Sequence, residues 1–240
     1  MTAQLDLGGV SVDVLFKDIK NVHLSVYPPT GRVRISAPER MNLDAIRIFA
    51  ISKLDWIKRQ QKRLQGQERE TPREYLDRES HYLWGKRYLL QILEMDAAPS
   101  VQLNHGKILL WVRSRTSEDK RQAIVAQFYR EQIKAVVPPL VTRWASVIGV
   151  NVDRFYVQQM KTKWGSCNPR ARAIRLNTEL AKKPKHCLEY IIVHEMAHIL
   201  VRHHNDRFTA LMDKFIPQWQ HYREELNRFP LGHRTWYWPR

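Results

Sequence analysis

One apolar run of the chain reads Ile191-Ile192-Val193-His194-Glu195-Met196-Ala197-His198-Ile199-Leu200 and contains the pattern His-Glu-x-x-His. Its apolar residues recur at helical spacing, which predicts a helix. Residues four apart lie on one face of a helix, so His194 and His198 can bind the same metal ion. Glu195 lies about 100° round the helix, where its carboxylate can reach a water bound to that ion. This arrangement is typical of a metallopeptidase with two histidine ligands and a carboxylate general base.

The pattern by itself is short and occurs by chance in many chains, so its surroundings matter. Two histidines and a glutamate on a largely apolar helix are costly to bury without a partner. A bound cation would provide that partner, and the apolar flanks therefore favour a metal site over a chance match.

A catalytic zinc ion usually takes three protein ligands and a water molecule. We favour His204 as the third ligand, although a straight helix would turn it about 240° away from His198. The chain must therefore bend, and Asn205 or Asp206 is a suitable cap for a new helix. We thus expect a break near residues 202–205. The alternative third ligands are Glu224, Glu225, His203 and Asp206.

Length and composition restrict the class of protein. A chain of 240 residues can bury a sizeable core, as one domain or two closely joined ones. No apolar stretch reaches about 18 residues, the start of the chain lacks a secretory pattern, and two cysteines make no disulfide framework. We therefore expect a cytoplasmic protein without a membrane span.

Basic residues outnumber acidic ones, and the formal net charge is +16. Such a charge favours polyanions as partners. The basic residues are spread along the chain, and no known DNA-reading motif is present. The net charge therefore has two interpretations, a solvated cationic surface or a weak affinity for nucleic acid.

The pattern of elements predicts an α+β fold, in which a β-rich N-terminal region packs on a C-terminal metallopeptidase domain. We place that region, with one long helix capped by Asn42, at residues 1–115 and the metallopeptidase domain at 116–240, and we expect a linker or loop at 66–80. The predicted strands are 10–16, 22–27, 32–38, 81–85, 88–93, 101–104, 107–112, 152–158 and 173–180. The predicted helices are 42–65, 117–137 ending at Pro138-Pro139, a second segment to 148, one from about Pro184 through the metal ligands, and one from about 205 to 226.

The loop predicted at residues 161–169 leads into the strand before the metal-site helix. A peptidase substrate usually lies extended beside an edge strand, and the strand at 173–180 is placed to serve in this way. Cys167 is either a small packed residue or a residue with a direct chemical role, as a metal ligand or as a thiolate. Lys163 or a backbone N–H here could steady the oxyanion. The candidate substrate-binding residues are Lys163, Trp164, Gly165, Ser166 and Cys167.

Six segments carry a family resemblance: Lys20–Val26, Arg32–Pro38, Lys53–Ile57, Met160–Cys167, Val193–His198 and His204–Phe208. With them the chain resembles the YgjP-like metallopeptidase family over roughly residues 12–228. The resemblance implies a minimal zincin-like catalytic domain, related to SprT-like proteases that act on DNA-bound proteins. It also implies that His204 is the third metal ligand.

We therefore predict a zinc metallopeptidase in which His194, His198 and His204 bind Zn²⁺. Glu195 would activate a zinc-bound water to attack a peptide bond of a protein or peptide substrate. His203 and Tyr222 are candidate oxyanion donors, and Glu189 and Asp206 are candidates for orienting the ligand imidazoles. The alternative is a nucleic-acid-associated binding protein with a structural zinc site, in which Cys167 would be the fourth ligand.

Overall fold

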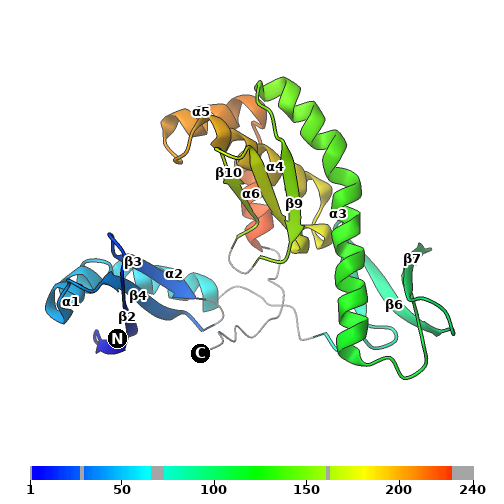
Figure 1. Ribbon diagram of the computed structural model, residues 1–240, viewed down its shortest axis with the longest axis horizontal. Helices are drawn as coiled ribbons and strands as arrows, with labels where there is room; N and C mark the ends of the chain where they lie inside the picture. The colour runs from blue at the N-terminus through cyan, green and yellow to red at the C-terminus, as the bar shows by residue number, and fades with distance from the viewer. Residues whose placement is uncertain (1, 28–29, 66–72, 161–162, 229–240) are drawn as a thin grey trace. The chain divides into compact units, whose positions relative to one another are not determined.

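The structure, a computed structural model, describes residues 2–27, 30–65, 73–160 and 163–228 (Figure 1). The chain contains helices and mixed sheets, as expected for the α+β class. Contacts divide it into two compact units, with the boundary after Thr71 and the second unit running from Pro72 to Phe229. Residues 66–72 of the predicted linker lie outside the described residues, so each unit is described by itself.

The first unit is a sheet of four strands with two helices. Its strands are β1 (Thr2–Asp6), β2 (Ser11–Lys17), β3 (His23–Tyr27) and β4 (Arg32–Pro38), in the order β1-β2-β4-β3. Asn42 caps α1 (Leu43–Ser52), as predicted, and accepts a hydrogen bond from the Ala45 N–H. The single long helix predicted here is wrong, because the chain leaves α1 at Lys53 and continues as α2 (Leu54–Gln65). The break lets both helices contribute to one core, through Ile46 on α1 and Ile57 on α2.

The second unit begins with another sheet of four strands. These are β5 (Ser80–Leu83), β6 (Lys86–Glu94), β7 (Ser100–Asn104) and β8 (Lys107–Val112), in the order β5-β6-β8-β7. Buried residues of this sheet, such as Leu90 and Ile108, share one core with Val125 and Ile133 of the following helix. The domain boundary expected between residues 115 and 116 therefore falls inside this unit, because that helix covers the apolar face of the sheet.

The two sheets of four strands have the same topology, although the sequence shows no evident repeat. Each has a parallel central pair, β2 with β4 and β6 with β8, and an antiparallel strand on either side. In each unit, the last strand of this sheet is followed by a helix. That helix begins after Asn42 in the first unit and after Ser117 in the second.

The helix α3 runs without interruption from Glu118 to Ile148 (Figure 1). The sequence predicts that it ends at Pro138-Pro139, and this prediction is wrong. A proline inside a helix costs roughly 3 kcal/mol. Here the helix buries residues both before and after the prolines, including Val137 and Ile148, and this packing outweighs the cost. Among the described residues, no helix has the length and apolarity needed to cross a membrane.

A sheet of three strands, in the order β10-β11-β9, leads into the metal-site helix. Its strands are β9 (Arg154–Gln158), β10 (Gly165–Asn168) and β11 (Ala173–Asn177), and the 3-10 helix η1 (Thr178–Lys182) follows. The sequence predicts a loop where β10 lies and an edge strand at 173–180. The structure corrects both, because β11 pairs on its two sides and ends at Asn177, which leaves β10 at the edge.

The last three helices are α4 (Lys185–Leu200), α5 (Asp206–Phe215) and α6 (Trp219–Arg228). Helix α4 packs against β10 and β11 on one side and against α3, α5 and α6 on others. The single helix predicted from 205 to 226 is wrong, since α5 ends at Phe215 and is separated from α6 by Ile216, Pro217 and Gln218. Pro217 cannot donate the backbone hydrogen bond that a continuing helix would need.

Candidate metal centre

Helix α4 holds His194 and His198 on one face, as the four-residue spacing predicts. The ring centroids of the two histidines lie 4.9 Å apart, and the planes are nearly perpendicular at 85°. The helix is anchored by core residues on its other faces, among them Leu188, Ile192 and Met196, all with no exposed surface. The two imidazoles therefore project from a rigid support.

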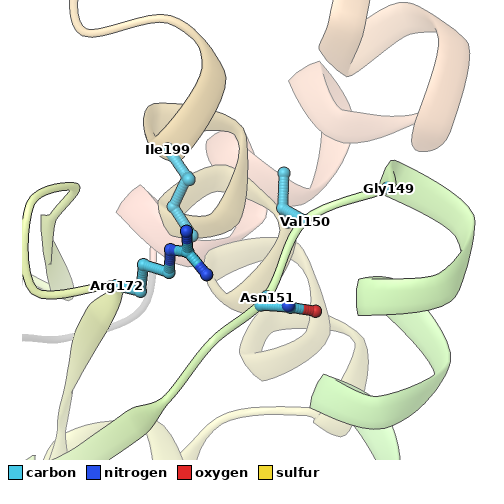
Figure 2. A pocket seen from close by; sticks show the side chains of 5 residues that line it. All are labelled: Gly149, Val150, Asn151, Arg172 and Ile199. Carbon is cyan, nitrogen blue, oxygen red and sulfur yellow. The ribbon is translucent and has the colours of Figure 1, made fainter.

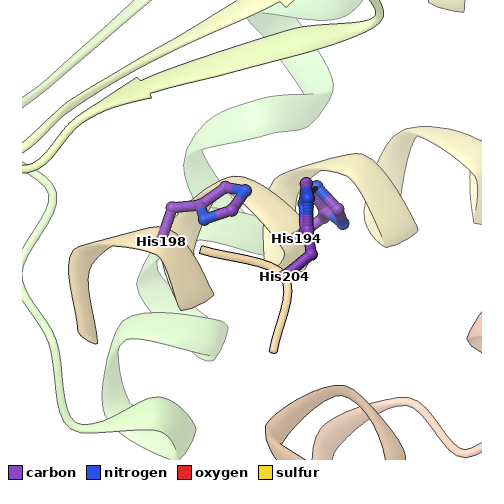
Figure 3. A group of neighbouring side chains, drawn as sticks. All are labelled: His194, His198 and His204. Atoms are coloured by element: carbon purple, nitrogen blue, oxygen red, sulfur yellow. Dashed lines mark hydrogen bonds between the residues drawn. The ribbon is translucent and has the colours of Figure 1, made fainter. Parts of the chain in front are cut away.

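His204 reaches the same place because the chain bends after α4. Val201 leaves the helix in an extended conformation, and the Asn205 side chain caps α5 by accepting a hydrogen bond from the Phe208 N–H at 3.1 Å. The break expected near residues 202–205 is thus confirmed. The bend brings the three imidazoles together (Figure 3), with one ligand atom of each within 4.8 Å of the others.

The ring nitrogens of the cluster are suited to a cation. The His198 Nδ1 atom lies 3.0 Å from the carbonyl oxygen of Val201, an acceptor, so Nδ1 donates the hydrogen bond and Nε2 is the nitrogen available to a metal ion. Burial, and then the neighbouring His198 and His204, lower the pKa of His194 to about 3. Burial also lowers the pKa of His204. Neutral imidazoles are the form that binds metal, and three of them match the donor set of a catalytic zinc site.

Three nitrogens of the cluster also lack an ordinary partner. The Nε2 atoms of His194 and His204 face each other at 3.0 Å, and the buried Nδ1 atom of His194 has no hydrogen-bond partner among the described residues. A divalent ion held by the imidazoles would give ring lone pairs a partner. The residues present therefore fit a metal ion.

Phe208 forms a wall of the cluster. Its ring centroid lies 5.0 Å from that of His194, 4.7 Å from that of His198 and 4.7 Å from that of His204. Phe208 is itself buried, so it connects the three ligand rings to the core of the second unit.

Glu195 is buried beside the histidines, with 5% of its surface exposed. Burial raises the pKa of its carboxyl to about 8, against the opposing charge of Lys163. The backbone of Gly165 at the start of β10 lies directly against it. A Cβ atom at this glycine would be 2.6 Å from Oε1 and 2.8 Å from Cγ of Glu195.

The predicted substrate-binding segment lies mostly on β10. Trp164 precedes the strand, and Gly165, Ser166 and Cys167 belong to it, while Lys163 is exposed at its approach. Burial, and then the charge of Glu195, raise the pKa of the Cys167 thiol to about 11. Cys167 is not a member of the histidine cluster. Lys161 and Thr162 of the same motif lie outside the described residues.

Several other candidates have partners away from the cluster. Tyr222 packs on the ring of His186 and donates its hydroxyl to Gln218, and Glu189 accepts hydrogen bonds from Arg143 and Trp144. Glu225 binds His186, and Glu224 pairs with Arg228. His203 and Asp206 are exposed and are not part of the cluster of possible ligands.

Sequence reasoning missed two residues close to the cluster. Tyr190 lies one turn before His194 on α4, and the two ring centroids are 5.8 Å apart. The cation of Arg223 on α6 lies close enough to act on His194, His204 and Tyr190. The position of Tyr190 four residues before His194 was a readable signal, whereas Arg223 comes from a separate helix and gives no such signal.

A surface pocket elsewhere in the second unit is lined by Gly149, Val150, Asn151, Arg172 and Ile199 (Figure 2). None of the three histidines lines it. We therefore base the chemistry on the histidine cluster and not on this pocket.

Comparison with known proteins identifies the family of the chain. A structure of the metallopeptidase zymogen of Pyrococcus abyssi abylysin is similar at 17% identity, covering 38% of this chain and 91% of that one, with a TM-score of 0.36. The zymogen of Methanocaldococcus jannaschii jannalysin is similar at 19% identity, covering 37% and 90%, with a TM-score of 0.33. No curated protein matches. The model of the YgjP-like metallopeptidase domain matches residues 20–229. The chain therefore belongs to the YgjP-like metallopeptidase family.

Proposed function

We propose that the chain is a zinc peptidase that hydrolyses peptide bonds in protein or peptide substrates, with His194, His198 and His204 as metal ligands. One observation carries the proposal: three imidazoles converge to within 4.8 Å of one another beside a buried glutamate. A metal-dependent peptidase is what the family implies. The identity of the metal and the roles of the single residues are our inference from the donor set.

Bound Zn²⁺ would supply a Lewis acid that acidifies water and polarises a carbonyl group. Glu195 would accept a proton from the attacking water as the new C–O bond forms. It would then deliver that proton to the amide nitrogen as the C–N bond breaks. Burial raises the pKa of Glu195, and the charge of a bound Zn²⁺ would favour the carboxylate form that accepts the proton.

The edge strand β10 is the element that we assign to substrate binding. It pairs with β11 on one side and is the outermost strand among those described in this sheet. An extended peptide can add to such an edge through backbone hydrogen bonds. Because Gly165 has no side chain, the peptide would run close to Glu195.

The alternative of a structural zinc site needs four protein ligands and no water. Within the described part of the chain, the cluster offers three, and Cys167 is not among them. This favours an open coordination position. The net charge of +16 supports, in addition, a weak affinity for nucleic acid, and we infer that the enzyme acts near it. A binding constant that does not change with salt would contradict this affinity.

The substitution Glu195→Gln tests the proposed function. We expect the variant to keep its metal and lose hydrolysis of a denatured protein, because the amide cannot accept the proton. Glu131→Gln on the exposed face of α3 is the matched control and should leave both unchanged. Hydrolysis by Glu195→Gln at the parent rate would show that Glu195 is not the general base.

A further inference from the structure

The packing of α6 on α4 leads to a polar pair next to the metal ligands. On α6, Trp219, Tyr222, Arg223 and Leu226 have the spacing i, i+3, i+4, i+7 and so share one stripe of the helix. Trp219 and Leu226 are buried in the core that includes α4, which shows that this stripe faces α4. Arg223 therefore lies on the side of α6 that is directed toward the metal-site helix.

Contacts near the start of α4 fix the position of α6. The His186 ring lies 4.9 Å from that of Tyr222, and its Nε2 atom donates a hydrogen bond to Glu225. On α4, His186 is followed on the same face by Tyr190 after one turn and by His194 after two. The stripe of α6 that carries Arg223 thus meets the face of α4 that leads to the ligands.

Arg223 and Tyr190 have polar groups that the fold itself does not use. Among the described residues, no carboxylate pairs with Arg223, although Glu224 and Glu225 on either side of its position are both paired. Tyr190 is 4% exposed, and its hydroxyl makes no hydrogen bond within the described part of the chain. Its ring meets that of His194 edge-on at 68°. An unpaired guanidinium and a tyrosine hydroxyl without a hydrogen bond therefore lie near the same proposed ligand, His194.

We propose that Arg223 and Tyr190 are catalytic residues that donate hydrogen bonds to the carbonyl oxygen of the scissile peptide bond. This proposal rests on the peptidase function proposed above. As water attacks the carbonyl carbon, its oxygen gains negative charge, and donors already held in place stabilise that charge without rearranging. The fixed positive charge of Arg223 is not lost at any working pH. The pair would take the role for which the sequence had offered His203, Tyr222 and Lys163.

The test uses the zinc-loaded full chain and two readouts. The first is peptide hydrolysis, and the second is the affinity for a phosphonic acid peptide measured by calorimetry, since its oxygens carry the charge that the carbonyl oxygen acquires. Arg223→Met should lower kcat/KM about 10²-fold, mainly through kcat, as loss of one such donor does. It should weaken phosphonate binding by a similar factor, and Arg223→Lys should recover part of both. Tyr190→Phe should lower both about tenfold.

Matched controls are available away from the histidine cluster. Arg228→Met removes the same charge from a side chain that pairs with Glu224, and Tyr82→Phe removes a hydroxyl from an exposed tyrosine on β5. Neither should change hydrolysis or phosphonate affinity. The zinc content and urea midpoint of Arg223→Met should equal those of the parent chain, because Arg223 is exposed and makes no ion pair within the described residues.

The outcomes separate this proposal from the proposed function. If the parent hydrolyses peptides while Arg223→Met retains both hydrolysis and phosphonate affinity, the assignment of Arg223 is wrong. If the parent binds the phosphonate through Arg223 but cleaves no peptide, the anion site stands and the peptidase function fails. A loss of zinc or of stability in Arg223→Met and Arg223→Lys alike would reduce Arg223 to a structural residue and overturn the assignment.

Discussion

The backbone of Gly165 lies so close to the carboxyl group of Glu195 that a Cβ atom at residue 165 would be 2.6 Å from Oε1. Only glycine allows the edge strand β10 to approach the buried Glu195 carboxyl group so closely. A Cβ atom at residue 165 would also lie 2.9 Å from the Ile191 Cγ2 atom. The close approach therefore involves the packing of β10 on α4 as well as the carboxyl group.

The substitution Gly165→Ala should therefore impair hydrolysis. The methyl group would displace Glu195 or push β10 away from α4, and overpacking of this kind costs about 1–3 kcal/mol. We expect hydrolysis to fall at least tenfold with unchanged zinc content, measured by steady-state kinetics and elemental analysis.

Gly149→Ala is the control for that experiment. Gly149 has a φ of 78° and no atom near its Cβ position, so alanine there is strained but meets no clash. It should lower the free energy of unfolding by about 1 kcal/mol and leave hydrolysis intact. Equal effects of the two substitutions on activity would show that the contact with Glu195 is unimportant.

The adjacent residues His203 and His204 give a direct test of the metal ligands. His204 belongs to the cluster and His203 does not, so His204→Ala should lose most bound zinc and His203→Ala should keep it.

Zinc bound to the native state also adds stability. At free zinc about 100-fold above its Kd, a chelator should lower the free energy of unfolding of the parent by about 2.7 kcal/mol. Elemental analysis and urea unfolding measure both effects, and full zinc content in His204→Ala would contradict the predicted ligand set.

Phe208 should matter for both stability and metal affinity. Removal of a buried aromatic ring costs about 3–5 kcal/mol, so Phe208→Ala should strongly lower the free energy of unfolding. Because the ring contacts all three histidines, we also expect the zinc affinity to fall about tenfold. Phe208→Leu keeps most of the volume and should cost less than about 1.5 kcal/mol. Zinc titration measures the affinity, and urea unfolding measures the stability. An unchanged zinc affinity in Phe208→Ala would show that the Phe208 ring does not position the three histidines.

Cys167 should react slowly with alkylating reagents. The thiolate is the reactive form, and burial followed by the charge of Glu195 raises the pKa of this thiol from 9.0 to about 11. At pH 8 the thiolate fraction is then about 100-fold lower than for a thiol of pKa 9, and it rises about tenfold with each pH unit up to 11. Peptide-resolved mass spectrometry after iodoacetamide treatment measures the rate, with urea-unfolded protein as the control.

Zinc distinguishes the two interpretations of the same thiol. If Cys167 is a packed residue, its alkylation rate should not depend on zinc. Protection by zinc at every pH would instead indicate a fourth metal ligand and support the structural site.

Features that depend on a few neighbouring residues were readable from the sequence alone. The spacing of His194 and His198 puts both rings on one helical face, whatever the rest of the chain does. The cap at Asn205 depends on a side chain reaching a backbone N–H three residues later, so the bend that frees His204 was also predictable. These are properties of helix geometry and of local hydrogen bonds.

Other features depend on burial between segments that are distant in the sequence. Strand β10 has only four residues, and its place at the edge follows from pairing with β11, which no local pattern reports. The helix α3 continues through Pro138 and Pro139 because packing before and after the two prolines compensates for the hydrogen bonds that they cannot donate. The approach of Gly165 to Glu195 and of Arg223 to Tyr190 likewise arises from the packing of β10 and α6 on α4. The chain's own spacing thus predicted the metal ligands that we propose, and the tertiary packing decided what surrounds them, because helix periodicity acts within one segment and burial acts between segments.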